Sequence, residues 1–221
     1  MTRLHSLSVA DEPGTWAALG FSVVDATVWI GSTGIFCGGA ALGRGIVDWT
    51  LIAGADAPVG MIDGLTTSTA GPLRSAPASS PDHVNGVVAI DHIVISTTDV
   101  ERSVAAFETV GLELRRRREG AAYGSQRMRQ AFFWLGDPDG PIDGKVILEV
   151  VGPETPEPER ATEPARFFGL ALTVRDLSST MAFFGDLMKP PTDAVQSGRQ
   201  ITTISSRAGS SVAIAVMSPH H

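Results

Sequence analysis

The chain has 221 residues, of which 43% are hydrophobic and 19% charged, and its formal net charge at pH 7 is −7. It is long and apolar enough for a globular core, the negative charge without a basic stripe argues against nucleic-acid partners, and no apolar run approaches the roughly 20 residues of a membrane-spanning helix. The single cysteine, Cys37, and the lack of a signal-peptide core near the N-terminus predict a cytoplasmic protein.

The first predicted unit covers residues 1–54 and is an abbreviated one. Asp11 can cap a short helix, Pro13 stands at its start, and Gly20 can end it. A strand is expected before this helix. Short apolar runs predict further strands after it, at 21–24, 27–30, 34–37 and 45–52.

A long polar stretch follows the first unit. Residues 55–87 are rich in Pro, Gly, Ser and Thr and show no sustained period, which predicts a linker or a draped crossover. His83 lies near its end. We interpret it as an exposed loop histidine, with the alternative that it reaches toward His92 in the next unit and adds a metal ligand.

The second unit, residues 88–153, has the clearest pattern of elements in the chain. Alternation over 90–96 predicts a strand. Asp99 can cap the amphipathic helix that is predicted over 100–110, and Gly111 can end that helix. The unit therefore starts as a strand followed by a helix.

Two polar residues interrupt apolar strands of this second unit. His92 lies in the first strand, and Glu149 lies in the last one, KVILEVVGP, at 145–153. An unpaired buried carboxylate costs several kcal/mol, so this polar pair needs a partner or a purpose. Either the two residues bond each other, the backbone or water at a sheet edge, or they form half of a metal site or an acid and base pair.

Arginines and aromatic residues lie between these two strands. Four arginines follow one another in the run LRRRRE at 114–119. Strand alternation lets at most half of them face a ligand; the alternative is that the whole run is a solvated edge of the sheet. Phe132 and Trp134 share one face of the strand QAFFWL, with Phe133 on the other. We predict that a ligand contacts Phe132, Trp134 and Tyr123; the alternative is that the aromatic residues belong to the core. Arginines and Tyr123 near the cavity would suit a ligand that carries a carboxylate or a phenol group.

A third unit repeats the second. Residues 154–166 are acidic and proline-rich and predict a solvated linker to this unit at 167–219. FGLALTVRDLSSTMAFFGDLMKPP copies the strand and helix, and SVAIAVMSP copies KVILEVVGP. Gly169 and Ala215 stand at the positions of the polar pair, so the repeat has lost it. The two C-terminal histidines are interpreted as a frayed tail.

The order of these elements resembles a known superfamily. A strand that opens with His92, with Ile95, Thr97 and Asp99 in the spacing H-x-x-L-x-V-x-D, then a helix and strands ending in ILEVVGP, is similar to the glyoxalase, bleomycin-resistance and extradiol dioxygenase superfamily, also called vicinal oxygen chelate. The resemblance covers residues 88–219 well and the first unit weakly. It implies an α+β fold in which repeated βαβββ modules form curled mixed sheets around a small-molecule cup.

The resemblance also implies how a metal would be held. Paired modules of the superfamily each give a first-strand and a last-strand ligand to one ion, which needs three or four protein ligands. His92 and Glu149 are the candidate ligands for a divalent ion such as Fe, Mn, Ni or Zn, whereas the first unit has Leu4 and Leu51 there. One chain thus offers an incomplete set, which a homodimer that pairs second modules could complete.

Two functions follow from the resemblance. The first is a glyoxalase-like or dioxygenase-like enzyme, of lyase, isomerase or ring-cleavage type, that uses the His92 and Glu149 cup with or without a divalent metal. Without a metal, Glu149 would be a general base next to a carbonyl and His92 an acid or an orienting residue. The alternative is a metal-free protein that binds or sequesters a planar small molecule. Either way, we expect a small-molecule partner and neither nucleic acid nor membrane.

Overall fold

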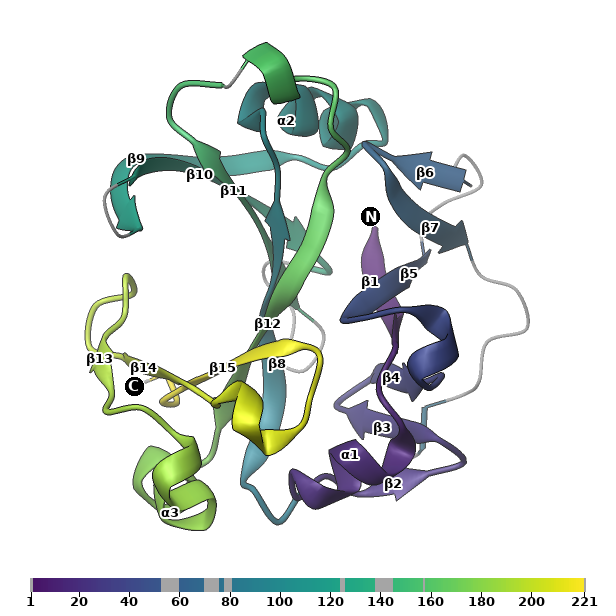
Figure 1. Cartoon of the computed structure of the whole chain (residues 1–221), viewed down its shortest axis with the longest axis vertical. Coiled ribbons are helices and arrows are strands. Elements are labelled where there is room, and N and C mark those ends of the chain that lie inside the picture. The colour runs from purple at the N-terminus through teal and green to yellow at the C-terminus, as the bar shows by residue number, and fades with distance from the viewer. Residues whose placement is uncertain are drawn as a thin grey trace.

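The computed structural model describes residues 2–52, 60–69, 76–77, 81–123, 126–137, 145–156 and 158–220. Its strands form two mixed sheets that pack against each other, and the sheet from the C-terminal part of the chain curls strongly (Figure 1). No helix of the described part of the chain is both long and apolar enough to span a membrane.

Sheet A holds the N-terminal strands. Its elements are β1 (Arg3–Val9), α1 (Pro13–Ala18), β2 (Val23–Val24), β3 (Thr27–Ile30), β4 (Thr33–Cys37), β5 (Ile46–Ile52), β6 (Gly60–Ile62) and β7 (Leu65–Thr69). A 3₁₀ turn at Ala40–Leu42 precedes β5. The strand order is β2-β3-β4-β1-β5-β7-β6.

Sheet B holds the other strands. Its elements are β8 (Val87–Ser96), α2 (Val100–Thr109), β9 (Leu114–Tyr123), β10 (Gln126–Leu135), β11 (Val146–Pro153), β12 (Arg166–Val174), α3 (Leu177–Phe184), β13 (Thr192–Asp193), β14 (Gln200–Thr203) and β15 (Ala213–Met217). Short 3₁₀ turns lie at Pro158–Arg160, Gly185–Leu187 and Ser206–Ala208. The strand order is β13-β14-β15-β12-β8-β11-β10-β9.

Sheet B is built from two βαβββ units that join through their first strands. β8 runs parallel to β11, β12 runs parallel to β15, and β8 and β12 pair antiparallel at the centre. This arrangement confirms the predicted α+β fold of repeated βαβββ modules in curled mixed sheets. The second and third units pair within one chain.

The first unit ends earlier than predicted. β1 runs parallel to β4, as β8 does to β11, whereas β5 lies antiparallel to β1, as β12 does to β8. Residues 3–37 therefore form the complete unit, and β5 begins another half unit. Leu51 lies opposite Leu4, and the residue that occupies the register position of Glu149 is Gly34, opposite Ser6.

The predicted linker at 55–87 also contains structure. β6 and β7 form an antiparallel hairpin, and β7 pairs parallel with β5. The turn between β6 and β7 is Asp63 and Gly64, which both have positive φ, 47° and 88°. Two left-handed residues in a two-residue turn are the geometry that matches the twist of a hairpin.

Helix capping follows the sequence in sheet B but not in sheet A. The Asp99 carboxylate accepts a hydrogen bond from the backbone N–H of Arg102 at 3.1 Å and so caps α2. The N-cap of α1 is Glu12, without a side-chain hydrogen bond. The predicted capping role of Asp11 is therefore wrong: its carboxylate instead accepts from Trp16 Nε1 at 3.2 Å and from the backbone N–H of Ser211 at 2.8 Å.

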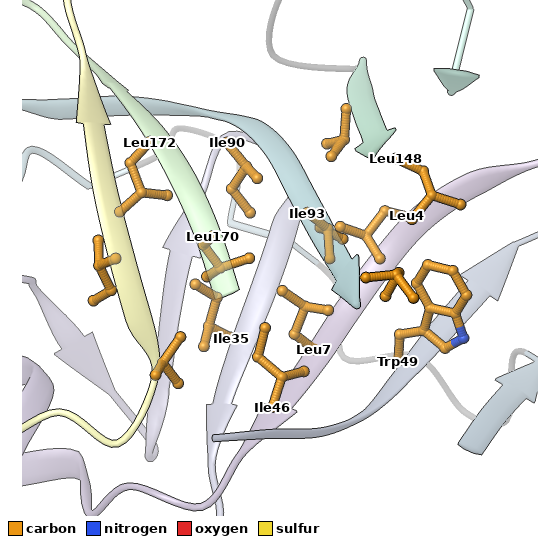
Figure 2. Packing of buried hydrophobic residues seen from close by; sticks show 14 of the residues in the cluster. Leu4, Leu7, Ile35, Ile46, Trp49, Ile90, Ile93, Leu148, Leu170 and Leu172 are labelled. Atoms are coloured by element: carbon orange, nitrogen blue, oxygen red, sulfur yellow. The ribbon is translucent and has the colours of Figure 1, made fainter. Parts of the chain in front are cut away.

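An apolar core fills the space between the two sheets (Figure 2). Trp49 of β5 is fully buried in it, and its ring centroid lies 6.2 Å from that of Phe107 in α2 and 5.4 Å from that of Phe167 in β12. Its indole N–H donates to Thr67 Oγ1 at 2.7 Å. Since Ile93 of β8 faces this core, the period of the strand sends His92 to the opposite, concave face of sheet B.

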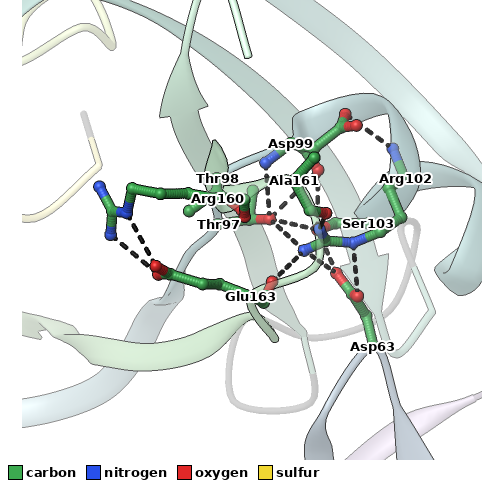
Figure 3. A network of polar contacts seen from close by, with 9 residues as sticks. All are labelled: Asp63, Thr97, Thr98, Asp99, Arg102, Ser103, Arg160, Ala161 and Glu163. Carbon is green, nitrogen blue, oxygen red and sulfur yellow. Dashed lines mark hydrogen bonds and ion pairs between the residues drawn. The ribbon is translucent and has the colours of Figure 1, made fainter. Parts of the chain in front are cut away.

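A polar network joins the sheets beside this core (Figure 3). Asp63, in the β6–β7 turn, accepts from Arg102 Nε at 2.8 Å and also accepts a hydrogen bond from Ser103 Oγ, both in α2. The Arg102 guanidinium further donates to the carbonyl oxygens of Ala161 and Glu163. The missed hairpin is thus tied to the second module and to the segment before β12.

Candidate functional site

A cavity of about 450 Å³ lies on the concave face of sheet B. That volume is in the range of small-molecule sites. Strands of both the second and the third module contribute to it, together with the turn after β13. Its lining residues are His92, Arg115, Arg116, Gln130, Phe132, Phe133, Trp134, Ile147, Glu149, Asp193, Ala194, Val195, Gln196, Ile201 and Met217.

The two residues of the polar pair face each other in this cavity. β8 and β11 are parallel neighbours, with His92 opposite Ile147 and Glu149 two residues further on, so both side chains share one face. His92 Nε2 lies 3.5 Å from Glu149 Oε2. The two side chains are 14% and 13% exposed, so a ligand can reach them while most of their surface is removed from water.

A neighbour that sequence reasoning missed holds the other side of the imidazole. Asp91 Oδ1 lies 2.9 Å from His92 Nδ1. Strand alternation would send adjacent residues to opposite faces, but the register between β8 and β12 shifts here: His92 lies opposite Ala171 and Ile90 opposite Leu172, which leaves Asp91 as a bulged residue. A bulge re-aims a side chain, so Asp91 can contact His92.

Asp91 is ionised and rigidly held. Its side chain is 3% exposed, and Oδ2 accepts from Arg199 Nη1 at 2.6 Å and from Thr173 Oγ1 at 3.1 Å. Burial raises the pKa of Asp91, but the hydrogen bond from His92 and the charges of His92 and Arg199 outweigh it and lower this pKa to about 2. The carboxylate is therefore an acceptor, and His92 Nδ1 carries the proton of their hydrogen bond.

The depressed pKa of Asp91 predicts a specific acid sensitivity. A carboxylate whose pKa falls from 3.8 in the unfolded chain to about 2 in the folded protein stabilises the fold above pH 4, and this stabilisation disappears as the pH falls to 2. At about 1.4 kcal/mol per pKa unit the contribution is roughly 2 kcal/mol. Urea unfolding between pH 4 and pH 2 should show a steeper loss of stability in the wild type than in Asp91→Asn. Equal slopes would contradict this assignment.

With Nδ1–H directed at Asp91, the atom of His92 that faces Glu149 is Nε2. An imidazole nitrogen and a carboxyl oxygen that face each other at 3.5 Å in a cavity are the two kinds of group that serve as an acid and base pair.

Glu149 has a second partner that sequence reasoning also missed. Gln130 Nε2 donates to Glu149 Oε1 at 2.5 Å, and Arg118 Nη1 donates to Gln130 Oε1 at 3.2 Å. A signal was present: Gln130 lies two and four residues before Phe132 and Trp134, so strand period places all three on one face. This contact fixes Oε1 and leaves Oε2 toward His92.

The predicted aromatic contacts are placed as follows. Phe132 and Trp134 line the cavity. Phe133 is 1% exposed and packs against Phe107 in the core, with 5.6 Å between ring centroids, although it also borders the cavity. The side chain of Tyr123 lies outside the described residues. Phe132 and Trp134 thus form the wall for an apolar group.

The arginine run divides between the cavity and the outside. Arg115 and Arg116 both line the cavity. A register shift between β9 and β10, where Phe132 lies opposite Arg116 and Phe133 opposite Leu114, makes Arg115 the extra residue and accounts for two adjacent side chains there. Arg117 turns outward, with Nη1 at 2.5 Å from a carboxylate oxygen of Glu101 in α2.

Two other histidines differ from their predicted roles. His83 is buried rather than exposed; Nδ1 accepts from the backbone N–H of Ser22 at 3.1 Å, and Nε2 lies 3.1 Å from the Trp29 carbonyl oxygen. It stabilises sheet A and adds no ligand. His220 is not a frayed tail, because its Nε2 lies 3.0 Å from Arg199 Nη1 and 3.7 Å from Asp91 Oδ2.

The donor set does not fit a divalent metal. Within the described residues, no group of three or more His, Cys, Asp or Glu side chains is placed to hold an ion. Asp91 is committed to His92 and Arg199, which leaves His92 and Glu149. The predicted homodimer would pair the second modules of two chains to complete the ligand set. In this structure β12 of the same chain already pairs with the edge of β8 where such a copy would bind, so that dimer cannot supply the missing ligands. A homodimer through another surface stays a prediction.

No protein-family model and no curated protein matches the sequence. Among solved structures the chain is similar to methylmalonyl-CoA epimerases. A selenomethionine form is 16% identical over 61% of this chain and 97% of that one, with a TM-score of 0.48. A variant of the Streptomyces coelicolor enzyme in complex with 2-nitronate-propionyl-CoA is 19% identical over 61% of this chain and 99% of that one, with a TM-score of 0.47. The Mycobacterium tuberculosis enzyme is 16% identical over 62% of this chain and 91% of that one, with a TM-score of 0.46. At these values the likeness says nothing about chemistry.

Proposed function

We propose that the cavity on sheet B is the active site of a small-molecule enzyme of isomerase or lyase type, which moves a proton at a carbon next to a carbonyl group. One observation carries the proposal: His92 is held on one side by the ionised Asp91, and its other nitrogen faces Glu149 inside a cavity with an aromatic wall. An ion pair between His92 and Glu149 that served structure alone would not need a second, buried carboxylate behind the imidazole.

In the proposed step Glu149 takes one proton from the substrate and His92 donates one to it. Glu149 Oε2 takes the proton from the carbon, the electrons of the broken C–H bond form a C=C bond, and the carbonyl oxygen becomes an enolate. His92 Nε2–H donates to that oxygen, and Asp91 stabilises the imidazolium that donates. Return of the proton to either face of the carbon, or loss of a neighbouring leaving group, gives an isomerase or a lyase.

The lining of the cavity supports an anionic substrate. Arg115 and Arg116 both line it, and guanidinium pairs best with carboxylate or phosphate; Arg115 Nη1 also lies 2.8 Å from a carboxylate oxygen of Glu113, so Arg116 is the better candidate for an anion. Phe132 and Trp134 offer a flat apolar wall. The proposed substrate is a small carbonyl compound with an anionic group and an apolar or planar body.

Two other functions receive less support. Ring cleavage needs a metal with three or four protein ligands, and the described donors fit no such ion. A sequestration protein would use the aromatic wall, but it has no need of a buried carboxylate and guanidinium behind a histidine, because burying such charges is costly. A protein that binds a small molecule but does not exchange its hydrogen with solvent would nevertheless be a sequestration protein.

The test is exchange of substrate hydrogen with solvent. Wild-type protein in D₂O is incubated with carbonyl compounds that carry an acidic α-hydrogen, namely aromatic 2-oxo acids, 2-substituted 3-oxo acids and carboxyl-bearing thioesters, each beside its neutral ester. Deuterium at the α-carbon is followed by NMR. We expect exchange for at least one anion, and about a tenfold higher KM in Arg116→Met for that anion but not for its ester, since one charged hydrogen bond is worth about 1.5 kcal/mol.

Arg117→Met is the matched control, because Arg117 belongs to the same strand but pairs with Glu101 outside the cavity. Its KM should stay within twofold of the wild type. Tight binding of a panel member without any exchange would overturn the proposed enzyme in favour of sequestration. Equal effects of the Arg116 and Arg117 substitutions would overturn the proposed anion site.

A further inference from the structure

Arg199 lies immediately before β14 and is almost completely buried, with a side chain 2% exposed. Its Nη1 donates to Asp91 Oδ2 at 2.6 Å, its Nη2 to Thr173 Oγ1 at 3.0 Å, and its Nε to the carbonyl oxygen of Ser218 at 2.9 Å. Thr173 also donates to Asp91, at 3.1 Å. The guanidinium is thus fixed by several elements at once.

These contacts cross from the third module to the second. Arg199, Thr173 and Ser218 belong to the third module, which has Gly169 and Ala215 where the second has its polar pair. Asp91 belongs to β8 of the second module. The third module therefore has no counterpart of the polar pair, but it contributes a cation directly behind the carboxylate that holds His92.

The same guanidinium also holds part of the cavity wall. Gln196, in the turn between β13 and β14, lines the cavity, and its side-chain oxygen accepts a hydrogen bond from Arg199 Nη1. Val195 of this turn lines the cavity as well, although it is 55% exposed. One buried side chain thus connects the wall that a ligand contacts to the carboxylate behind the imidazole.

Packing alone does not account for this arrangement. Two charges are removed from water almost completely, and buried ion pairs are often no more stabilising than apolar side chains of the same volume. What the pair does provide is geometry, since an imidazole nitrogen that donates to a fixed carboxylate keeps one tautomer and one ring orientation.

We propose that Arg199 is a positioning residue, which fixes the orientation of Asp91 and, through it, the Nδ1–H tautomer and ring orientation of His92. It acts on the proposed reaction without touching the substrate. The inference rests on the proposed function for its catalytic consequence, but its structural part, the state of the His92 ring, is measured without any substrate.

The first test is NMR of protein labelled with ¹⁵N at histidine. In the wild type, His92 Nδ1 should carry a slowly exchanging proton. Arg199→Met keeps the length of the side chain but removes the charge and its hydrogen bonds, so this proton should exchange rapidly and its signal should broaden or vanish. Arg199→Lys restores the charge beside Asp91 without the fork of donors, and it should recover part of the signal.

The second test is kinetic, with the substrate found by solvent exchange. Arg199→Met should lower kcat about 10-fold to 100-fold, the range for loss of a residue that orients a catalytic group, with KM changed less than threefold. Gln196→Ala separates the two contacts of Arg199, because it should raise KM and leave the Nδ1–H signal intact. Arg207→Met is the matched control, since Arg207 is exposed and pairs with Asp186.

Thr173→Val serves as a second variant if Arg199→Met does not fold, because it removes one hydroxyl that contacts both charged groups. It should speed exchange of the Nδ1 proton to a smaller degree. A wild-type Nδ1–H signal and wild-type kcat in folded Arg199→Met would overturn the inference. Dependence of the His92 signal on Arg199 in a protein that exchanges no substrate would support the positioning role and overturn the proposed function instead.

Discussion

Replacing Glu149 with glutamine is expected to lower the rate of α-hydrogen exchange by about 10² to 10⁴, the usual contribution of a general base. Glutamine keeps the shape of the side chain but cannot accept a proton from carbon at this site. Binding should change little, because the apolar wall and the arginines are untouched. Exchange rates by NMR and ligand affinity by calorimetry, measured on the same sample, test this expectation.

Glu154→Gln is the control for this substitution. Glu154 is the first residue after β11, but it pairs with Arg127 at 3.1 Å and does not line the cavity. Its exchange rate should remain within twofold of the wild type. Exchange within threefold of the wild type in Glu149→Gln would remove Glu149 from the role of base.

Trp49→Ala is expected to destabilise the protein by about 3–5 kcal/mol, the usual cost of removing a large buried aromatic side chain. Trp49 is fully buried and contacts Phe107 and Phe167 across the interface between the sheets, and its indole N–H is bonded to Thr67. The substitution removes all of these contacts and leaves Thr67 without its donor. Urea unfolding followed by circular dichroism measures the change.

Met61→Ala provides the comparison in the same sheet. Met61 lies in β6 and is 74% exposed, so its removal should cost less than about 0.5 kcal/mol. Similar losses in the two variants would mean that the core between the sheets does not hold them together. Retention of the cavity in Trp49→Ala, with sheet A unfolded, would show that sheet B folds alone.

The local pattern of the chain was sufficient to predict most individual elements. Alternation located β8, and the Asp99 cap located the start of α2, because these features depend on residues a few positions apart. The repeat of strand and helix in the third unit predicted a further βαβββ module, but not which modules pair with each other. Each of these signals is contained within a short stretch of sequence.

Pairing between distant strands was harder to predict. β5 was expected to end the first unit, but it lies antiparallel to β1, and apolar residues such as Leu51 fit either partner. The β6–β7 hairpin was hidden in a stretch of mixed composition, although Asp63–Gly64 is a strong signal for a tight hairpin turn. Composition over a long window masked this local signal.

The site was predicted in part for similar reasons. His92 and Glu149 stood out because polar residues are costly in apolar strands, whereas Asp91 is delivered by a bulge that reverses the expected alternation. Arg199 comes from a turn 108 residues away from Asp91. No local pattern distinguishes such an arginine from a solvated one, because its partner is set by the pairing of two modules.

The most direct test of the account is the exchange rate of protein freed of metal with a chelator and verified by elemental mass spectrometry. The proposed mechanism transfers protons through His92 and Glu149 and uses no metal, so the treated protein should exchange substrate hydrogen at the rate of the untreated protein, and Glu149→Gln should not. Loss of exchange on chelation, with recovery on addition of a divalent ion, would contradict proton transfer by the His92 and Glu149 pair alone.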